Sequence, residues 1–432
     1  MNVKQTKVLL IASAVLLLTA PKATAQEVAE EKFQIEINTL ASQKAVLNAF
    51  RIIDDLEPET IADLIHLTEI PAPPFKEEVR AEEFKRMLEK AGADRAWIDK
   101  EGNVIALRKG TEGKRTVAVD AHLDTVFPEG TDVTVKQRGD TLFAPGIGDD
   151  TRGLSMVLAL LKTMEQAGLE TKSDILFIGT VGEEGQGDLR GVKYLFQSGE
   201  YGIDSWISID GGEIGRVNNA GLGSKRYRAI FKGRGGHSWG AFGLANPHHA
   251  LGVAINNFTK RAHEFVSTGP RTSFNVGIIG GGTSVNSIPF ESFMEVDMRS
   301  VSPERLNQID SLFKSEMMSS LREYNRSGVR DSVSLELVKM GDRPSGEVDV
   351  KTPLIQRAIA ATTFMGAEPR LTRGSTNSNI PIYLGVPSVT IGRGGVGSGG
   401  HSLGEWWINK NGAEAIKLAL IITLAEAEYV NN

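Results

Sequence analysis

Five short motifs that contain histidine or acidic residues follow apolar stretches typical of β-strands. The first four are Ala121-His122-Leu123-Asp124, Gly148-Asp149-Asp150, Gly182-Glu183-Glu184 and Ile209-Asp210-Gly211. The fifth, Gly399-Gly400-His401-Ser402-Leu403-Gly404-Glu405, lies in a glycine-rich loop after the strand predicted at 388–391. These motifs offer only imidazole and carboxylate ligands, a set that suits Zn²⁺, with Co²⁺ or Mn²⁺ as substitutes.

The overall composition narrows the chemistry further. The chain contains no cysteine, which excludes disulfides, thiolate zinc sites and cysteine nucleophiles. Its formal net charge of −6 gives no basic surface, so we expect no nucleic-acid partner. Any metal ion must therefore be held by His, Asp and Glu side chains.

The spacing within the motifs suggests distinct roles for neighbouring residues. His122 and Asp124 are two positions apart, so on a strand they face the same side, and the acid could orient a metal-bound imidazole. Glu183 and Glu184 would lie at the mouth of a buried strand, where carboxylates are costly unless they are paired, protonated or metal-bound. Each motif alone also fits a solvated turn. Their joint occurrence after successive strands is what indicates a site.

The elements that must position these motifs alternate between strand and helix. Apolar runs at 116–119, 175–181 and 206–209 predict strands, and apolar residues with helical spacing predict helices at 77–91, 152–167, 353–364 and 412–430. This alternation indicates an α/β fold, with a central sheet flanked by helices. Ligands of such sheets bind beyond the carboxyl ends of the strands, which is where the motifs fall.

The pattern changes in the middle of the chain. Strand-like runs and two predicted helices, at 247–265 and 303–324, indicate a small α+β domain inserted at 221–338. The α/β domain would then comprise 41–220 and 339–432, preceded by a flexible leader at 26–40.

The N-terminus is typical of a signal peptide. Lys4 and Lys7 precede an apolar run at 8–20, and Ala23-Thr24-Ala25 supplies small residues for cleavage. We predict a signal peptide at 1–25 with cleavage after Ala25. The mature protein would be periplasmic or secreted, with no stable membrane anchor. The alternative is that the apolar run is not cleaved and anchors the protein in the membrane.

The order of the five motifs resembles that of a dinuclear-zinc metallopeptidase family. That family includes peptidase T, glutamate carboxypeptidase, acetylornithine deacetylase and succinyl-diaminopimelate desuccinylase, and the chain is most similar to the peptidase T-like di- and tripeptidases. The resemblance covers nearly the whole mature chain. It implies a zinc-exopeptidase-like catalytic domain with an inserted lid of the dimerisation type.

The resemblance also implies roles at the centre. His122 and Asp210 would bind one divalent ion, Glu184 and His401 would bind a second, and Asp149 would bridge the two. Asp124 would orient His122, and Glu183 would act as general base on a water shared by the two ions, which are expected to be zinc.

Further residues are carried over in the lid and in the second part of the catalytic domain. His237, within Gly233-Arg234-Gly235-Gly236-His237-Ser238, matches a lid histidine that stabilises the oxyanion, often across a dimer interface. A homodimer through the lid is therefore expected. The predicted substrate-binding residues are Asn286, Arg299, Ser375 and Asn379. Two departures from the family, Arg152 in place of Lys and Asn377 in place of Asp, bear on substrate preference.

These features predict a metal-dependent exopeptidase that cleaves an amide bond of a small peptide, as a di- or tripeptidase or an aminopeptidase-like enzyme. A deacylase of N-acyl amino acids would use the same centre. A non-catalytic metal- or peptide-binding protein of the same fold is an alternative of another class. A serine hydrolase is a further one, because Gly-x-Ser-x-Gly occurs around Ser238 and Ser402.

Overall fold

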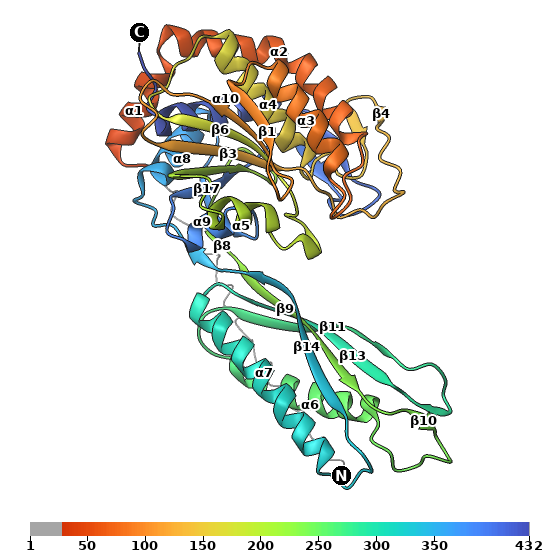
Figure 1. Ribbon diagram of the computed structural model, residues 1–432. Coiled ribbons are helices and arrows are strands. Elements are labelled where there is room, and N and C mark those ends of the chain that lie inside the picture. Colours follow the sequence, from red (N-terminus) through yellow and green to blue (C-terminus); the bar gives the residue numbers. More distant parts are fainter. Residues whose placement is uncertain (1–27, 432) are drawn as a thin grey trace, which may run out of the picture.

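The structure is a computed structural model that describes residues 28–431. It consists of a layered α/β domain and an elongated lid that projects from it (Figure 1). The structure confirms the predicted α/β fold class, in which helices flank a central mixed sheet and an α+β domain is inserted.

The main sheet has nine strands, and its central strands β6, β3, β7 and β17 run parallel to one another. Their near-continuous apolar sequences reflect burial on both faces. In spatial order the strands are β1 (Arg95–Ile98), β2 (Val104–Arg108), β6 (Asp174–Thr180), β3 (Thr116–His122), β7 (Ser205–Ile209), β17 (Ser388–Ile391), β8 (Arg216–Gly221) and β15 (Gly346–Glu347), with β16 (Arg370–Gly374) paired to β8.

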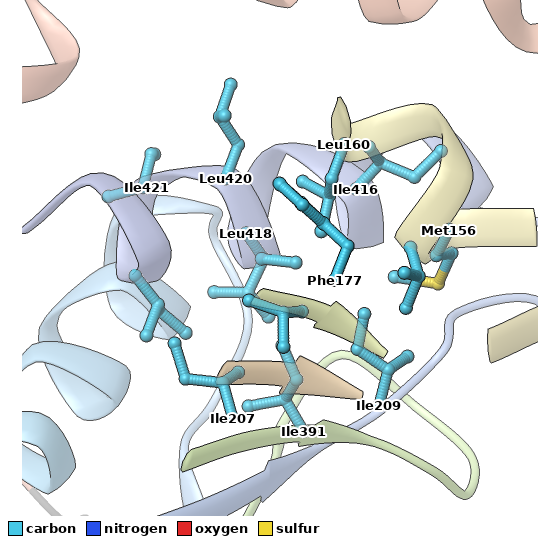
Figure 2. Close-up of a cluster of buried hydrophobic side chains, with 14 of the residues drawn as sticks. Met156, Leu160, Phe177, Ile207, Ile209, Ile391, Ile416, Leu418, Leu420 and Ile421 are labelled. Atoms are coloured by element: carbon cyan, nitrogen blue, oxygen red, sulfur yellow. The ribbon is translucent and has the colours of Figure 1, made fainter. Parts of the chain in front are cut away.

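Helices cover both faces of this sheet. The larger group lies on one face and consists of α1 (Glu31–Ala41), α2 (Lys44–Thr68), α3 (Glu78–Lys90), α4 (Thr151–Gln166), α8 (Pro353–Phe364) and α10 (Gly412–Glu426). The opposite face packs against α5 (Arg190–Gln197) and α9 (Asn379–Tyr383). Figure 2 shows the main core, in which Met156 and Leu160 of α4 and Leu418 of α10 meet Phe177 and Ile207 of the strands.

A small four-stranded sheet lies beside the main one and carries two of the five motifs in its connections. Its strands are β18 (Val396–Ser398), β19 (Trp406–Ile408), β5 (Thr141–Phe143) and β4 (Lys136–Arg138). The loop between β18 and β19 contains His401, and the segment between β5 and α4 contains Asp149.

The lid is an antiparallel sheet with two helices on one face. The sheet order is β11 (Thr272–Gly281), β13 (Glu291–Ser300), β9 (Gly223–Lys232) and β14 (Ser334–Arg343), and the helices are α6 (Pro247–Val266) and α7 (Pro303–Asn325). Buried and partly exposed residues alternate along β13, as expected for a sheet with one covered face. The short strands β10 (Gly236–His237) and β12 (Ser287–Ile288) pair at the far end of the lid (Figure 1).

Three boundaries differ from those predicted. The segment expected to be a flexible leader forms α1, because Phe33, Ile37 and Leu40 recur at helical spacing and are buried against the core. Helix α2 extends to Thr68 and includes Pro58, whereas the apolar spacing of the sequence predicts a helix only over 42–56. Strand β14 continues to Arg343, past the predicted lid boundary at 338.

The predicted signal peptide lies outside the described residues. Within residues 28–431, none of the helices is long and apolar enough to cross a membrane.

Candidate active site

The structure gathers the five predicted motifs at the carboxyl ends of the parallel strands. His122 is the last residue of β3, Glu183 and Glu184 follow β6, and Asp210 follows β7 directly. Asp149 and His401 reach the same place from the connections of the small sheet. Residues spread over most of the chain therefore share one edge of the main sheet, as is usual for α/β sites.

Two groups of three potential metal ligands share Asp149. One group is His122, Asp149 and Asp210, and the other is Asp149, Glu184 and His401; within each, one ligand atom per residue lies within 4.8 Å of the others. The Nε2 atom of His122 lies 3.4 Å from Asp149 Oδ1, and the Nε2 atom of His401 lies 3.3 Å from Asp149 Oδ2. The two oxygens of Asp149 thus face different histidines, which fits a carboxylate that bridges two cations.

The electrostatics of Asp149 set it apart from the other acids. Burial opposes its ionisation, but hydrogen bonds with His122 and His401 outweigh burial and hold its pKa well below the ordinary value. Burial and the nearby charge of Asp149 raise the pKa of Asp210. Hydrogen bonds with Asp149 and Glu184 raise the pKa of His401 to about 10. The site therefore concentrates negative charge on Asp149, the ligand common to both groups.

Asp124 connects two of the motifs, although not quite as predicted. The Nδ1 atom of His122 lies 2.9 Å from the backbone oxygen of Asp124 and 3.6 Å from its carboxylate. Because β3 ends at His122, the Asp124 carboxylate turns toward the next loop, where it accepts hydrogen bonds from the backbone N–H groups of Glu183 (3.0 Å) and Glu184 (2.8 Å). Asp124 therefore orients the His122 ring mainly through its carbonyl and fixes the Glu183-Glu184 turn through its carboxylate.

Glu183 is buried and paired with an arginine that the sequence analysis did not identify. Arg343 Nη1 lies 3.1 Å from Glu183 Oε1 and 3.0 Å from Ser375 Oγ, and Nη2 donates to the backbone oxygen of Glu183. Burial raises the pKa of Glu183 to about 8, although the charge of Arg343 opposes the shift. Such an environment suits a group that takes up and releases a proton near neutral pH.

Two more residues, to which the sequence analysis assigned no role, support the Asp149 loop. Arg393 Nη1 lies 3.3 Å from Asp149, 3.5 Å from Asp150 and 3.7 Å from Asp210, so it offsets part of the acidic charge. Glu405, which is buried, accepts hydrogen bonds from the backbone N–H groups of Gly146 (2.7 Å), Gly148 (2.9 Å) and Asp149 (3.0 Å). Glu405 thereby connects the Asp149 segment to the loop that carries His401.

The predicted lid residues lie at opposite ends of the lid: His237 and Asn286 are at the far end, and Arg299 is beside the start of β9, near the crossing into the catalytic domain. His237 lies on β10, at the end of the lid away from the main sheet (Figure 1). Its Nδ1 atom accepts from the backbone N–H groups of Trp239 (3.2 Å) and Gly240 (3.3 Å), which places the proton of the neutral ring on Nε2. Asn286 hydrogen-bonds Ser284. Arg299 pairs with Asp297 of the same strand at 2.7 Å.

The predicted substrate residues of the large domain differ in their surroundings. Ser375 contacts Arg343 and so lies beside Glu183. Asn379 is buried, and its side-chain amide donates to the backbone oxygens of Leu222 (3.0 Å) and Pro344 (2.9 Å), where the chain crosses between domains. The Asn379 amide thus joins the interdomain connections in this structure, and its role toward a substrate stays a prediction.

The two departures from the family pattern have structural explanations. Arg152 is fully buried, donates to the backbone oxygen of Gly412 at 3.0 Å and lies over the ring of Trp407. Asn377 donates from its amide nitrogen to Asp120 Oδ2 and Thr180 Oγ1, both at 2.7 Å. An aspartate at 377 would face the Asp120 carboxylate, so the amide suits this chain.

Neither candidate serine lies in a nucleophile elbow. Ser402 lies in a turn and donates to the backbone oxygen of Gly399 at 2.7 Å, and Ser238 follows the two-residue strand β10. Neither serine joins a strand directly to a helix, as such an elbow requires.

The fold and the site together define a hydrolase of the metallopeptidase class. The chain belongs to peptidase family M20/M25/M40, whose model matches residues 118–420. This membership confirms the resemblance on which the assignment of the motifs rested.

Several known proteins share this architecture. A putative LysW-lysine/LysW-ornithine hydrolase from Pyrococcus abyssi is 27% identical over 356 residues, which cover 78% of this chain and 85% of the relative. Aminopeptidase PepT from Bacillus cereus has a TM-score of 0.65 at 20% identity, with 85% of this chain and 98% of PepT covered. The YXEP protein of Bacillus subtilis is described as a dinuclear metal-binding peptidase. Its structure aligns with a TM-score of 0.64 at 17% identity, and the alignment covers 87% of this chain and 100% of the YXEP chain.

Proposed function

We propose that this protein is a dinuclear zinc exopeptidase that hydrolyses the amide bond of small peptides. The observation that carries the proposal is the sharing of Asp149 between two ligand groups, one with His122 and Asp210 and the other with Glu184 and His401. Imidazole and carboxylate ligands suit zinc, and the alternative ions with the same ligand preference are Co²⁺ and Mn²⁺. The di- and tripeptidase-like solved structures of the same fold support a small peptide as substrate.

In the proposed reaction, the two ligand groups that share Asp149 would hold two divalent ions, which when bound would lower the pKa of an attacking water and polarise the scissile carbonyl. Glu183 accepts the proton of that water and passes it to the leaving nitrogen. Arg343 holds the Glu183 side chain in place through a 3.1 Å contact, and Asp124 fixes the backbone of the same turn. The raised pKa of Glu183 makes it able to return the proton near neutral pH.

We propose that the lid supplies the hydrogen-bond donor to the oxyanion. The Nε2–H group of His237 is suited to this role because Nδ1 already accepts two backbone hydrogen bonds. Since β10 lies at the far end of the lid, His237 of the same chain reaches the centre only through a large movement of the lid (Figure 1). A second copy of the chain supplies the same group more directly.

We therefore propose a homodimer formed through the lid. Large apolar side chains near β10 and β12 are strongly exposed, namely Trp239, Phe242, Val285 and Phe290. Apolar groups gathered in this way are typical of an interaction surface. Sedimentation of the wild-type protein beside Trp239→Ala and Phe242→Ala variants tests the proposal, which predicts that the variants shift toward monomer.

We also propose that the mature enzyme acts in the periplasm or outside the cell. The support is the sequence at 1–25, with its positive start, apolar run and small residues at the cleavage position. N-terminal sequencing of the protein secreted by its natural host tests this, and an N-terminus at Gln26 is expected.

One experiment tests the enzymatic proposal. Metal analysis of the purified protein is combined with a substrate panel of di- and tripeptides and N-acyl amino acids. We expect two zinc ions per chain, cleavage of peptides, and loss of turnover by roughly 10²–10⁴-fold in Glu183→Gln with metal retained. Preference for N-acyl amino acids would instead indicate a deacylase, and absence of both metal and hydrolysis would indicate a binding protein.

A further inference from the structure

A cavity of about 480 Å³ adjoins the candidate metal centre and shares Glu184 with it. Its lining comes from three chain segments, of which two form mostly apolar walls and the third, Glu184, Gly185 and Gln186, is polar. Pro73, Pro74 and Phe75 form one wall, and Val126 and Pro128 form the other. The second wall directly follows the His122-x-Asp124 motif, so the cavity is continuous with the residues proposed to hold the metal ions.

Phe75 is held in an unusual position at this cavity. Its φ angle of +64° is in the left-handed region, which is unfavourable for a residue with a Cβ atom, and its side chain is 53% exposed. The backbone N–H of Phe75 donates to Glu77 Oε1 at 3.1 Å, and the guanidinium of Arg190 lies 5.2 Å from the ring. Backbone strain and an exposed aromatic ring, both maintained by buried or paired neighbours, are features of binding sites.

The two walls are joined by buried groups. Arg80 is fully buried and donates to the backbone oxygens of Ile70 (2.9 Å) and Leu123 (2.8 Å), one on each segment. Thr125 N donates to the backbone oxygen of Ala72 at 2.9 Å. The cavity is therefore preorganised and its position is fixed relative to His122.

The charges at the cavity are already compensated. Lys76 and Glu129 lie among the lining residues and form an ion pair with each other. Glu184 is engaged by His401 at 2.7 Å. A charged substrate side chain in this cavity would lose hydration and would find no unpaired charge of opposite sign to compensate the loss. An apolar side chain would instead bury its surface against proline, valine and phenylalanine.

We propose that this cavity is a specificity subsite that takes a large apolar side chain of the peptide substrate, with Phe75 as its principal determinant. The inference rests on the proposed function for the identity of the ligand as a peptide. It adds that one residue of the peptide, adjacent to the bond at the metal centre, has to be uncharged and apolar for tight binding.

The test measures binding separately from turnover. Tripeptides derived from Ala-Ala-Ala, with Leu, Asp or Lys at one position at a time, are titrated calorimetrically into zinc-loaded Glu183→Gln protein. We expect Leu at one position to bind at least about tenfold more tightly than Asp or Lys at that position. Phe75→Ala and Val126→Asn are expected to remove most of this preference, and Phe75→Leu is expected to retain it.

Two further variants separate loss of the ring from loss of folding. Phe75→Gly removes the ring but suits the left-handed backbone, so it should fold well and still lose the preference. Phe364→Ala, a matched change on the partly exposed surface of α8, should leave the preference unchanged. Retention of the preference in Phe75→Gly, equal or tighter binding of Asp or Lys at every position, or no binding by any peptide overturns the subsite.

The outcomes also separate this inference from the proposed function. Peptide cleavage by the wild-type enzyme without an apolar preference would leave the proposed function standing and reject the subsite. A Phe75-dependent preference in binding, with no cleavage by the wild-type enzyme, would support the subsite and reject the exopeptidase.

Discussion

The guanidinium of Arg343 lies 3.1 Å from the carboxylate of Glu183, although the two residues belong to different domains. Arg343 is the last residue of lid strand β14, and Glu183 follows β6 of the catalytic domain. Two further contacts join the same regions: the backbone N–H of Asp342 donates to Asp188, and Arg226 of β9 donates to the backbone oxygen of Gly185 at 3.2 Å. The turn that carries the proposed base is thus connected directly to the lid strands.

This relationship predicts the effect of replacing Arg343. In Arg343→Ala, Glu183 loses the cation that positions its carboxylate, and we expect kcat to fall roughly tenfold or more while zinc content is unchanged. Arg343→Lys should recover part of the loss because it restores the charge but not the two-pronged contact. Steady-state kinetics and metal analysis measure both effects. A change confined to the melting temperature would show that Arg343 has a structural role only.

Metal content should respond differently to different ligand variants. Asp149 belongs to both ligand groups, so Asp149→Ala is expected to lose both ions, whereas His401→Ala is expected to lose one. Elemental analysis after dialysis measures the stoichiometry, and a chelator should abolish the activity of the wild-type enzyme. Retention of one full equivalent of zinc in Asp149→Ala would contradict the shared ligand.

The stability of the metal-free protein should depend on pH through Asp120. Burial raises the pKa of Asp120 to about 7. An acid with a raised pKa in the folded state stabilises the fold below its ordinary pKa near 4, and this contribution is lost as the pH rises through 7. Urea unfolding in the presence of a chelator should therefore show weaker stability at pH 7.5 than at pH 5. Asp120→Asn should reduce the difference, and an unchanged difference would rule out Asp120 as its source.

Arg152 should contribute to stability without contacting the substrate. Its replacement in Arg152→Met removes the buried hydrogen bonds to the backbone oxygens of Gly412 and Arg393 and the 4.0 Å contact with Glu57. We expect a loss of about 1–3 kcal/mol in the free energy of unfolding. Arg86→Met is a suitable control because Arg86 pairs with Glu83 on the surface, where such pairs contribute little. Urea denaturation compares the two. Equal losses would argue against the role assigned to Arg152.

The sequence was sufficient to predict the parallel strands and the residues gathered at their ends. Apolar runs identified β3, β6, β7 and β17, and the carboxyl ends of such strands meet at one edge, so residues such as His122 and Asp210 could be placed together. Helix α1 was also accessible, since Phe33 and Ile37 have helical spacing, but the many polar residues between them favoured a loose leader.

The supporting residues could not be predicted in the same way. The partners of these residues lie far away in the chain, as the contacts of Arg343, Arg393 and Glu405 show. Arg343 and Arg393 also lie outside the histidine- and acid-containing motifs, whereas Glu405 ends the fifth motif. Their roles depend on how loops from different domains and sheets approach one another. Asp124 is an intermediate case, because its connection to His122 was predicted but the termination of β3 redirected its carboxylate.

The lid has a hydrophobic core of its own, which includes Phe231, Phe258 and Phe313 and is separate from the core beneath the main sheet. Within residues 28–431, the chain crosses between the two bodies near Leu222 and near Pro344. A polypeptide with two independent cores does not have to unfold in one cooperative step. A single melting temperature would then describe a mixture of two transitions, and the free energies of the variants above have to be assigned to the domain that each one perturbs.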